Sequence, residues 1–233
     1  MDTRTRLSDR YGRLPDPAFS REHTALLVVD MQYLDADPDH GLVARMKQQG
    51  FDEAYAYYCD RLKIIVPNIQ RLLAAFRGRK IEVIYTVIES LTRDGRERSL
   101  EHTRLNIFAA PGSKEAQVLE EIAPAEDEII LKKTCGSVFN STILHYVLHN
   151  LGIRTLVICG VVTGGCVESA VRDASNLSYQ VAVVEDACAT WTQAMHDAAI
   201  FAMNGVYARV YSTDELLRRL EAAVSLAPQP AHR

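Results

Sequence analysis

The sequence predicts an α/β protein with a doubly wound, Rossmann-like sheet of about six parallel strands in one domain. Two observations indicate this fold. Apolar runs alternate along the chain with segments of helical period, which is typical of a parallel sheet covered by helices. No linker divides the 233 residues, of which 48% are hydrophobic and 24% charged. We therefore expect an N-terminal arm over residues 1–20, the domain over 21–226 and a disordered tail over 227–233.

The strands are expected where β-prone apolar residues run without a break, because strands buried on both faces read as continuous hydrophobic runs. The first is TALLVVD at 24–30 and the second is IEVIYTVIE at 81–89. The remaining runs, shorter but similar in character, lie at 128–132, 154–160, 179–185 and 206–211.

Segments of helical period lie between these runs, at 51–77, 113–122, 140–151, 165–177, 192–204 and 213–224. Pro67 interrupts the first, so we expect two helices or one helix kinked there. Ser113 is the expected N-cap of the second helix, and Asn140 or Ser141 that of the third. Gly152 follows the third helix and is expected to end it.

The composition excludes several classes of protein. A net charge of −4 gives no electrostatic footprint for nucleic acid or an anionic membrane. The longest apolar runs are far shorter than the roughly 20 residues that span a bilayer. The first residues, MDTRTRLSDRYGRLPDPAF, contain no apolar signal-peptide core. We therefore expect neither nucleic acid nor membrane as a partner.

The five cysteines indicate a reducing compartment. They form no CxxC pair and no zinc spacing, and their number is odd, so free thiols and a cytoplasmic location are expected. His145 and His149 lie four residues apart, but no HExxH pattern or third ligand accompanies them, which favours a surface or interface role. The chain also lacks a GxGxxG or P-loop motif. We expect no cofactor and no metal.

Three polar residues follow predicted strands at the edge where parallel sheets bind ligands. Asp30 ends the first run, Lys133 follows the third, and Cys166 follows the fourth at the start of a helix. Each alone has an ordinary interpretation: a loop or capping aspartate, a solvated lysine and a core cysteine. Together they predict a nucleophilic site, in which the helix start and a nearby lysine lower the thiol pKa and an aspartate takes the proton. Lys132 is expected to be solvated.

Three segments, ALLVVDMQ at 25–32, KTCGSVFNST at 133–142 and GVVTGGCVESAVRDA at 160–174, resemble the isochorismatase-like cysteine hydrolases. This family includes nicotinamidases and amidohydrolases acting on N-carbamoylsarcosine, ureidoacrylate and biuret. The resemblance covers about residues 22–212 and implies the isochorismatase-like hydrolase fold. It also implies a catalytic triad of Cys166, Lys133 and Asp30, a cis peptide between Val161 and Val162, and an oxyanion hole formed by the Val162 and Cys166 amides.

Departures from the family pattern narrow the expected chemistry. Isochorismatases that cleave a vinyl ether lack the cysteine, so Cys166 favours amide chemistry. Nicotinamidases carry an Asp-x-His metal motif after the second strand, whereas residues 86–90 read TVIES. CVESAVRD resembles the ureidoacrylate branch. We expect a metal-free, cysteine-dependent amidohydrolase that cleaves a small linear amide or ureide (a ureidoacrylate, biuret, triuret or carbamoyl compound) through a thioacyl intermediate. A non-amide hydrolase of the same fold and a non-catalytic binding protein remain alternatives.

Other residues are candidates for binding the substrate. Arg93 and Arg96, with Arg98, lie in a loop after the second strand, where an arginine is expected either to grip a substrate oxygen or to be solvated. Asn204 is a candidate to hydrogen-bond the amide. Tyr33, Phe139 and Trp191 are candidates for pocket walls, with core or interface positions as the alternative.

The family resemblance also implies a homodimer or homotetramer. The expected contacts are the proline-containing N-terminal arm and the helix that carries His145, Tyr146 and His149.

Overall fold

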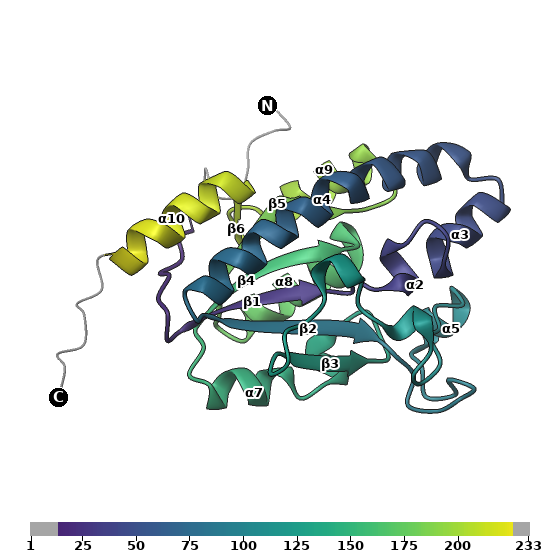
Figure 1. Cartoon of the computed structure of the whole chain (residues 1–233), viewed down its shortest axis with the longest axis horizontal. Coiled ribbons are helices and arrows are strands. Elements are labelled where there is room, and N and C mark those ends of the chain that lie inside the picture. Colours follow the sequence, from purple (N-terminus) through teal and green to yellow (C-terminus); the bar gives the residue numbers. More distant parts are fainter. Residues whose placement is uncertain (1–13, 226–233) are drawn as a thin grey trace.

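The computed structural model describes residues 14–225 and arranges them around one six-stranded parallel sheet (Figure 1). The strand order is β3-β2-β1-β4-β5-β6. The bounds of the strands are β1 (Thr24–Val29), β2 (Glu82–Ile88), β3 (Ile129–Lys133), β4 (Thr155–Val161), β5 (Gln180–Ala189) and β6 (Arg209–Tyr211). The sheet therefore has the predicted strand number and direction.

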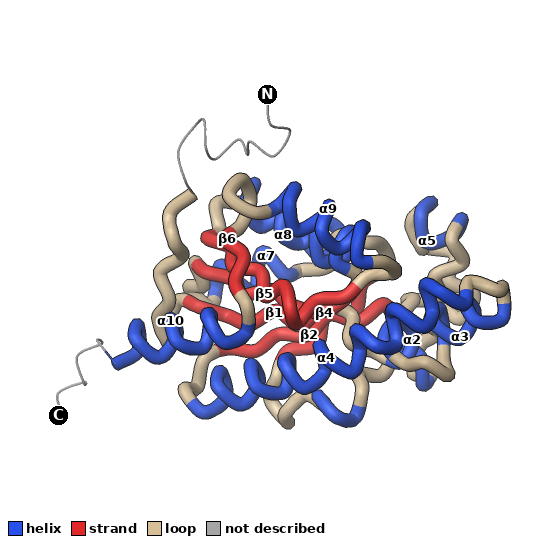
Figure 2. The backbone as a smooth tube through the Cα atoms, turned by 90° about the horizontal axis from the view of Figure 1, so that it is seen from above, coloured by secondary structure: helices blue, strands red, loops and turns tan. Residues whose placement is uncertain are grey.

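Helices cover both faces of the sheet. The long α4 (Asp52–Gly78) and α10 (Thr213–Ser225) lie on one face, and α7 (Leu144–Asn150), α8 (Glu168–Asn176) and α9 (Gln193–Met203) lie on the other (Figure 2). Because both faces are covered, every residue of β1 and β4 is buried. The core thus runs along both sides of these two central strands.

Short elements gather at the carboxyl ends of the strands, toward which the arrows point in Figure 1. They are α2 (Tyr33–Ala36), α3 (Gly41–Gln48), α5 (Leu100–Arg104), α6 (Val138–Ser141), the 3₁₀ turn η1 (Lys114–Ala116) and the π-helical turn η3 (Thr163–Val167). A second 3₁₀ turn, η2 (Glu120–Ile122), lies beside the middle of β2, where the Ile122 carbonyl accepts a hydrogen bond from the Tyr85 hydroxyl at 3.0 Å. The chain runs outward from β1 to β3 on one side and from β4 to β6 on the other. The strand order therefore reverses between β1 and β4, where ligands bind in open α/β sheets.

The structure differs from three expectations about helices. Of the two alternatives at Pro67, the division into two helices was wrong, because α4 continues through this residue, whose exposed position lets solvent satisfy the carbonyl that its missing N–H leaves free. The segment 113–122 forms only η1 and η2, because Val118 between them is extended and pairs with Gln32 after β1. The segment 140–151 divides at Thr142, whose hydroxyl accepts a hydrogen bond from the Leu144 N–H at 3.0 Å.

The described part of the N-terminal arm, residues 14–20, packs on its own chain. The Asp16 carboxylate accepts hydrogen bonds from Arg209, Tyr211 and Arg219. The Ala18 carbonyl accepts one from the Thr155 hydroxyl at 2.8 Å. These contacts tie the arm to the edge of the sheet at β6. The rest of the predicted arm and the predicted tail lie outside the described residues.

No helix within residues 14–225 combines the length and hydrophobicity needed to cross a membrane.

Candidate active site

Three side chains from three strand ends meet beside the point where the strand order reverses. The Lys133 Nζ lies 2.9 Å from the Asp30 Oδ2 and 3.2 Å from the Cys166 Sγ. Its third contact is the Cys135 carbonyl, to which it donates at 3.0 Å. The ammonium thus makes two hydrogen bonds and one ion pair, and the lysine joins the Asp30 side chain to the sulfur.

Backbone conformation and close strand packing hold Asp30 in place. The residue has a φ of 52°, a left-handed conformation that aspartate tolerates better than most residues. Thr86 on β2 fixes it twice, since its carbonyl accepts from the Asp30 N–H at 3.1 Å and its hydroxyl donates to Oδ1 at 2.8 Å. Across the reversal point, Gly160 has a φ of +117°, and a Cβ there would lie 2.1 Å from the Val29 carbonyl oxygen. Only glycine lets β4 approach β1 this closely.

The alternation of β3 decides which lysine reaches the site. Lys133 points inward and its side chain is 0% exposed, whereas the Lys132 side chain points to the opposite face and is 56% exposed. Lys132 instead forms an ion pair with Glu89 at 2.9 Å. Successive strand residues face opposite ways, so one register places a single lysine beside Cys166.

Cys166 lies in η3, directly after β4. The Val161–Val162 peptide bond that precedes this turn is cis. A side chain at Gly165 would require the turn to shift, because its Cβ would lie 2.9 Å from the Val162 Cγ2. The turn is also tied to α9 by the Thr163 hydroxyl, which lies 3.0 Å from the His196 Nδ1.

Burial sets the resting protonation of the cluster. Burial raises the pKa of the Cys166 thiol, and the charge of Asp30 adds to this effect while Lys133 opposes it. For Lys133, the attraction of Asp30 and Cys166 outweighs burial and raises the pKa. The lysine is therefore an ammonium paired with a carboxylate, and the thiol is neutral. The prediction of a lowered thiol pKa was wrong, because the Lys133 charge is already balanced by Asp30 and the site is out of water.

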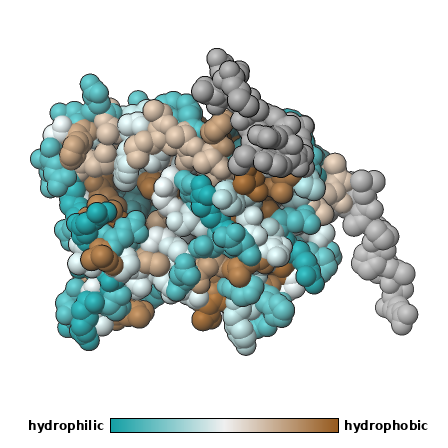
Figure 3. Space-filling model, turned by 180° about the vertical axis from the view of Figure 1, so that it is seen from behind, coloured by the Kyte–Doolittle hydropathy of each residue, from teal (hydrophilic) through white to brown (hydrophobic). Residues whose placement is uncertain are grey.

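A cavity of about 540 Å³ opens in front of Cys166. Its lining comes from five regions: the segment from α2 to the start of α4, the end of β2, the α5 segment, the β4–η3 turn and the start of α9. Figure 3 shows apolar side chains around a hollow on the left of the view, which is the end of the molecule that carries α2, α3 and α5. Of the six residues predicted to bind substrate, Trp191 lines this cavity.

The other five candidates do not line the cavity, and each has another environment. Arg93 is exposed, and Arg96, 72% exposed, pairs with Asp94. Asn204 forms a β-bridge with Ala208. The remaining two are aromatic side chains engaged elsewhere: Tyr33 packs against His40 and under the Lys114 ammonium, and Phe139 packs against Tyr179.

Sequence reasoning missed two buried polar residues that line the cavity, Asp35 and His102. The Asp35 Oδ2 and the His102 Nδ1 have no hydrogen-bond partner among the described residues. Asp35 is five residues after Asp30, so an acidic residue this close to a strand end was an available signal. No comparable signal exists for His102, because α5 follows a loop whose path the sequence does not specify.

Within residues 14–225, no three His, Cys, Asp or Glu side chains are grouped so as to hold a metal ion.

Comparison with known proteins identifies the family of this chain. The isochorismatase domain matches residues 24–215, and the chain belongs to the isochorismatase family. It is 35% identical over 191 residues to an Arabidopsis thaliana protein named "Probable inactive nicotinamidase", covering 79% of this chain and 89% of that one. It is 27% identical over 223 residues to the ureidoacrylate amidohydrolase of Acinetobacter baylyi, covering 88% and 87%.

The fold likewise resembles a solved structure. A cysteine hydrolase from Pseudomonas syringae pv. phaseolicola superposes with a TM-score of 0.75 at 27% identity, covering 88% of this chain and 96% of that one. The protein is thus a hydrolase of the isochorismatase family with the six-stranded parallel fold predicted from its sequence.

Proposed function

We propose that this chain is a cysteine-dependent amidohydrolase that cleaves the C–N bond of a small linear amide or ureide through a thioacyl-enzyme intermediate. One observation carries the proposal: the Cys166 sulfur lies on the wall of a cavity, 3.2 Å from a buried ammonium that is itself paired with Asp30. A relative that is a ureidoacrylate amidohydrolase adds support.

In the first half of the reaction, Asp30 takes the thiol proton as the Cys166 sulfur attacks the carbonyl carbon. The new C–S bond forms while the carbonyl π electrons move to oxygen, where the Val162 and Cys166 amides stabilise the negative charge. Collapse of this intermediate breaks the C–N bond. Asp30 returns its proton to the leaving nitrogen, which departs as ammonia or an amine.

In the second half, water attacks the thioester and gives a proton to Asp30. Collapse breaks the C–S bond, and Asp30 then reprotonates the sulfur. Lys133 stays an ammonium throughout, because its pKa is raised. Its role is to stabilise whichever of its two neighbours, the carboxylate or the sulfur, carries the negative charge. In this scheme the thiol is neutral at rest and becomes nucleophilic only when Asp30 takes its proton.

Ammonia release from a panel of amides and ureides tests the proposal, with Cys166→Ser as the blank. We expect the wild type to release ammonia and the variant to release none above background. Cleavage of a vinyl ether without ammonia release would instead favour the non-amide hydrolase. If the wild type bound amides without turnover of any compound, the protein would be a binding member of the fold.

The homodimer or homotetramer implied by the resemblance stays a prediction. Tyr146, on the helix expected to contribute to the interface, is 66% exposed in the single chain. Light scattering would contradict the prediction if it found a 26.0 kDa particle at micromolar concentration.

A further inference from the structure

The wall of the cavity is mostly apolar beyond Cys166. Its hydrophobic residues come from α3, from the end of β2, from the segment after α5 and from the start of α9. They include Leu42, Met46, Ile88, Ile107, Trp191 and Met195. The volume of about 540 Å³ lies within the range of about 300–1,000 Å³ typical of sites for drug-sized ligands. A compact, wholly polar ureide would leave most of this apolar wall uncovered.

Two buried titratable side chains, Asp35 and His102, line the cavity beside Cys166. Burial raises the pKa of Asp35 well above its usual value and lowers the pKa of His102 to about 4. The Arg45 guanidinium also lines the cavity and donates to the Asn106 carbonyl at 2.8 Å. Glu101, another lining residue, is exposed. The mostly apolar wall thus contains hydrogen-bonding groups beside the sulfur.

Asp35 supplies an acceptor that the folded chain leaves unused. It is 5% exposed, lines the cavity, and its Oδ2 has no hydrogen-bond partner among the described residues. Its backbone is fixed, because the carbonyl accepts from the Tyr58 hydroxyl at 2.8 Å and the N–H donates to the Gln32 carbonyl at 3.1 Å. A buried acceptor held in this way is satisfied best by a donor on the ligand.

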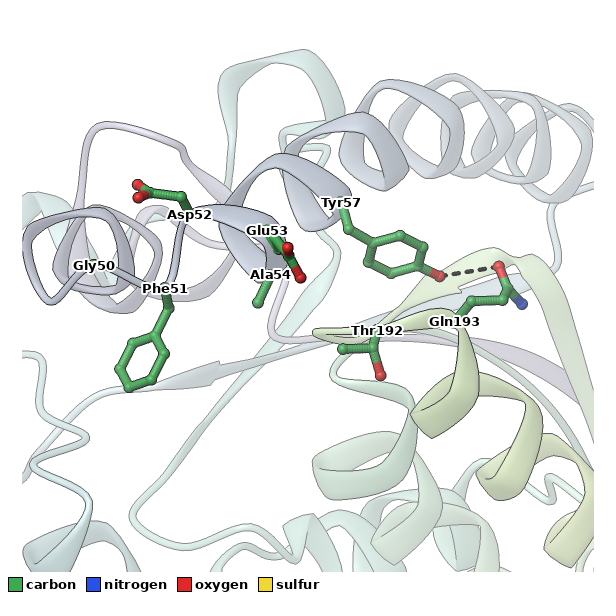
Figure 4. A pocket seen from close by; sticks show the side chains of 8 residues that line it. All are labelled: Gly50, Phe51, Asp52, Glu53, Ala54, Tyr57, Thr192 and Gln193. Atoms are coloured by element: carbon green, nitrogen blue, oxygen red, sulfur yellow. Dashed lines mark hydrogen bonds between the residues drawn. The ribbon is translucent and has the colours of Figure 1, made fainter.

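A second cavity adjoins the first. It has a volume of about 740 Å³ and shares Phe51, Ala54 and Thr192 with the first. In Figure 4, the Phe51 and Ala54 side chains point away from the α4 axis on the same side. The Tyr57 hydroxyl donates to the Gln193 Oε1 at 3.1 Å and links α4 to α9 (Figure 4). An acyl group too long for the first cavity therefore has room beyond it.

We propose that the substrate is a primary carboxamide with a large apolar acyl group, aromatic or branched. The acyl group packs against the apolar wall, and Asp35 accepts a hydrogen bond from the amide N–H. This inference rests on the proposed amidohydrolase function and selects within its substrates.

A matched substrate panel tests the substrate class. Phenylacetamide and isovaleramide represent the proposed class, whereas biuret and N-carbamoylglycine represent polar ureides. We expect kcat/KM for ammonia release to be at least about tenfold higher for the apolar amides, since apolar contacts of one or two carbons discriminate by about this factor. Equal or faster cleavage of the ureides would overturn the inference and leave the amidohydrolase function standing. Absence of ammonia from every compound would overturn both.

Substitution of the wall tests where the acyl group lies. Met195 lines the cavity and is 49% exposed, so Met195→Gln disturbs the core little. We expect it to reduce the preference for phenylacetamide over biuret by about threefold or more. Ile64 on α4 is 46% exposed and lies outside the cavity, so Ile64→Gln is the matched control and should leave the preference unchanged. Equal effects of the two substitutions would contradict the proposal.

A pair of substitutions at Asp35 separates binding from a structural role. Asp35→Leu removes the acceptor at similar size, whereas Asp35→Asn keeps a carbonyl oxygen that can accept the amide N–H. We expect kcat/KM for phenylacetamide to fall about tenfold or more in the first and about threefold or less in the second. Asp39, which is exposed on the same segment, supplies the control Asp39→Leu. If Asp35→Leu does not fold, Asp35→Ala replaces it with the same expectation.

Inhibition by phenylacetaldehyde distinguishes a binding role of Asp35 from a structural role, because a structural defect would weaken inhibition as well as amide turnover. The carbonyl carbon of the aldehyde forms a bond to the Cys166 sulfur, the thiol proton moves to the carbonyl oxygen, and the resulting thiohemiacetal has no N–H. We therefore expect its inhibition constant to change less than about threefold in Asp35→Leu. Equal weakening of amide turnover and aldehyde inhibition would show that Asp35 only maintains the fold of the site. Unchanged amide turnover would show that it binds nothing.

Discussion

Two regions at the carboxyl edge of the sheet differ in the burial of their charged groups. The cluster of Asp30, Lys133 and Cys166 is small, and its two charged groups are buried. The loop over residues 91–98 carries three arginines, two of them exposed at positions 93 and 96. The third, Arg98, donates to the Gly95 carbonyl of its own loop and to the Ile107 carbonyl beyond α5. Charge alone therefore does not mark a site in this fold. Charged groups can serve catalysis where they lie at the reversal of strand order and are shielded from water, because charges interact more strongly in such a site.

Substitution of Cys166 tests this comparison with the largest expected effect on kcat. Cys166→Ser should lower kcat by about 10⁴-fold or more, because a hydroxyl at the same place is not deprotonated by Asp30 at comparable cost. Cys135 is also half-buried, and its sulfur contacts the Ser137 carbonyl at 3.2 Å. Cys135→Ser should keep activity within about threefold. Loss of activity in both variants would mean that the nucleophile has been misassigned.

The proton shuttle should show the next largest effect. Asp30→Asn removes the general base and acid while it preserves the size of the side chain, so kcat should fall by about 10²–10⁴-fold. Asp39→Asn, an identical change on the exposed surface, should have no measurable effect on kcat. An Asp30→Asn enzyme with more than about one tenth of wild-type activity would exclude Asp30 as the shuttle.

Substitution of the two neighbouring lysines of β3 compares the loss of a buried ammonium with the loss of an exposed one. Lys133→Ala leaves the buried Asp30 carboxylate without its ion-pair partner, which should lower the free energy of unfolding by about 3–5 kcal/mol and reduce kcat. Lys132→Ala removes a half-exposed ion pair and should change stability by no more than about 1 kcal/mol. Urea denaturation and ammonia release measure the two effects. A destabilised or inactive Lys132→Ala enzyme would show that the register of β3 has been misread.

His102 predicts how stability depends on pH. Burial lowers its pKa from 6.5 to about 4, so between these values the unfolded chain binds a proton that the folded chain does not. The free energy of unfolding should therefore fall as pH is lowered from about 6.5 to 4, by up to about 3 kcal/mol from this group. In His102→Gln this part of the fall should disappear, whereas the exposed control His145→Gln should retain it. Identical pH profiles for both variants would refute the prediction.

The smallest effect is expected in the arginine loop. Arg93→Ala and Arg96→Ala should each change KM for an amide by less than about twofold, because neither side chain lines the cavity and exposed ion pairs contribute little. Steady-state kinetics checks this. An increase in KM of about tenfold or more for either variant would mean that the loop closes over the bound substrate.

The features that the sequence predicts best depend on periodicity and strand ends. The six strands follow from their apolar runs, and Asp30, Lys133 and Cys166 follow from being placed just after them. The resemblance to a family added the expectation of a cis peptide between Val161 and Val162, which the structure contains. The choice of Lys133 over Lys132 follows from strand alternation only once the register of β3 is known.

The rest depends on contacts between distant segments. The helix expected from Ser113 is lost because Val118 pairs with Gln32, far away in the sequence. The thiol pKa was misjudged because Asp30 balances Lys133 in a buried site. The cavity wall joins short elements whose positions no local pattern specifies, so Trp191 was found and His102 was missed.

Mass spectrometry of the enzyme acid-quenched during turnover of phenylacetamide tests the central claim most directly. The account predicts a phenylacetyl group bound as a thioester in the peptide that contains Cys166, absent from the peptides of the other four cysteines and from Cys166→Ser. Turnover with ammonia release and an acyl group on a different residue, or with no acyl group on any residue, would contradict it.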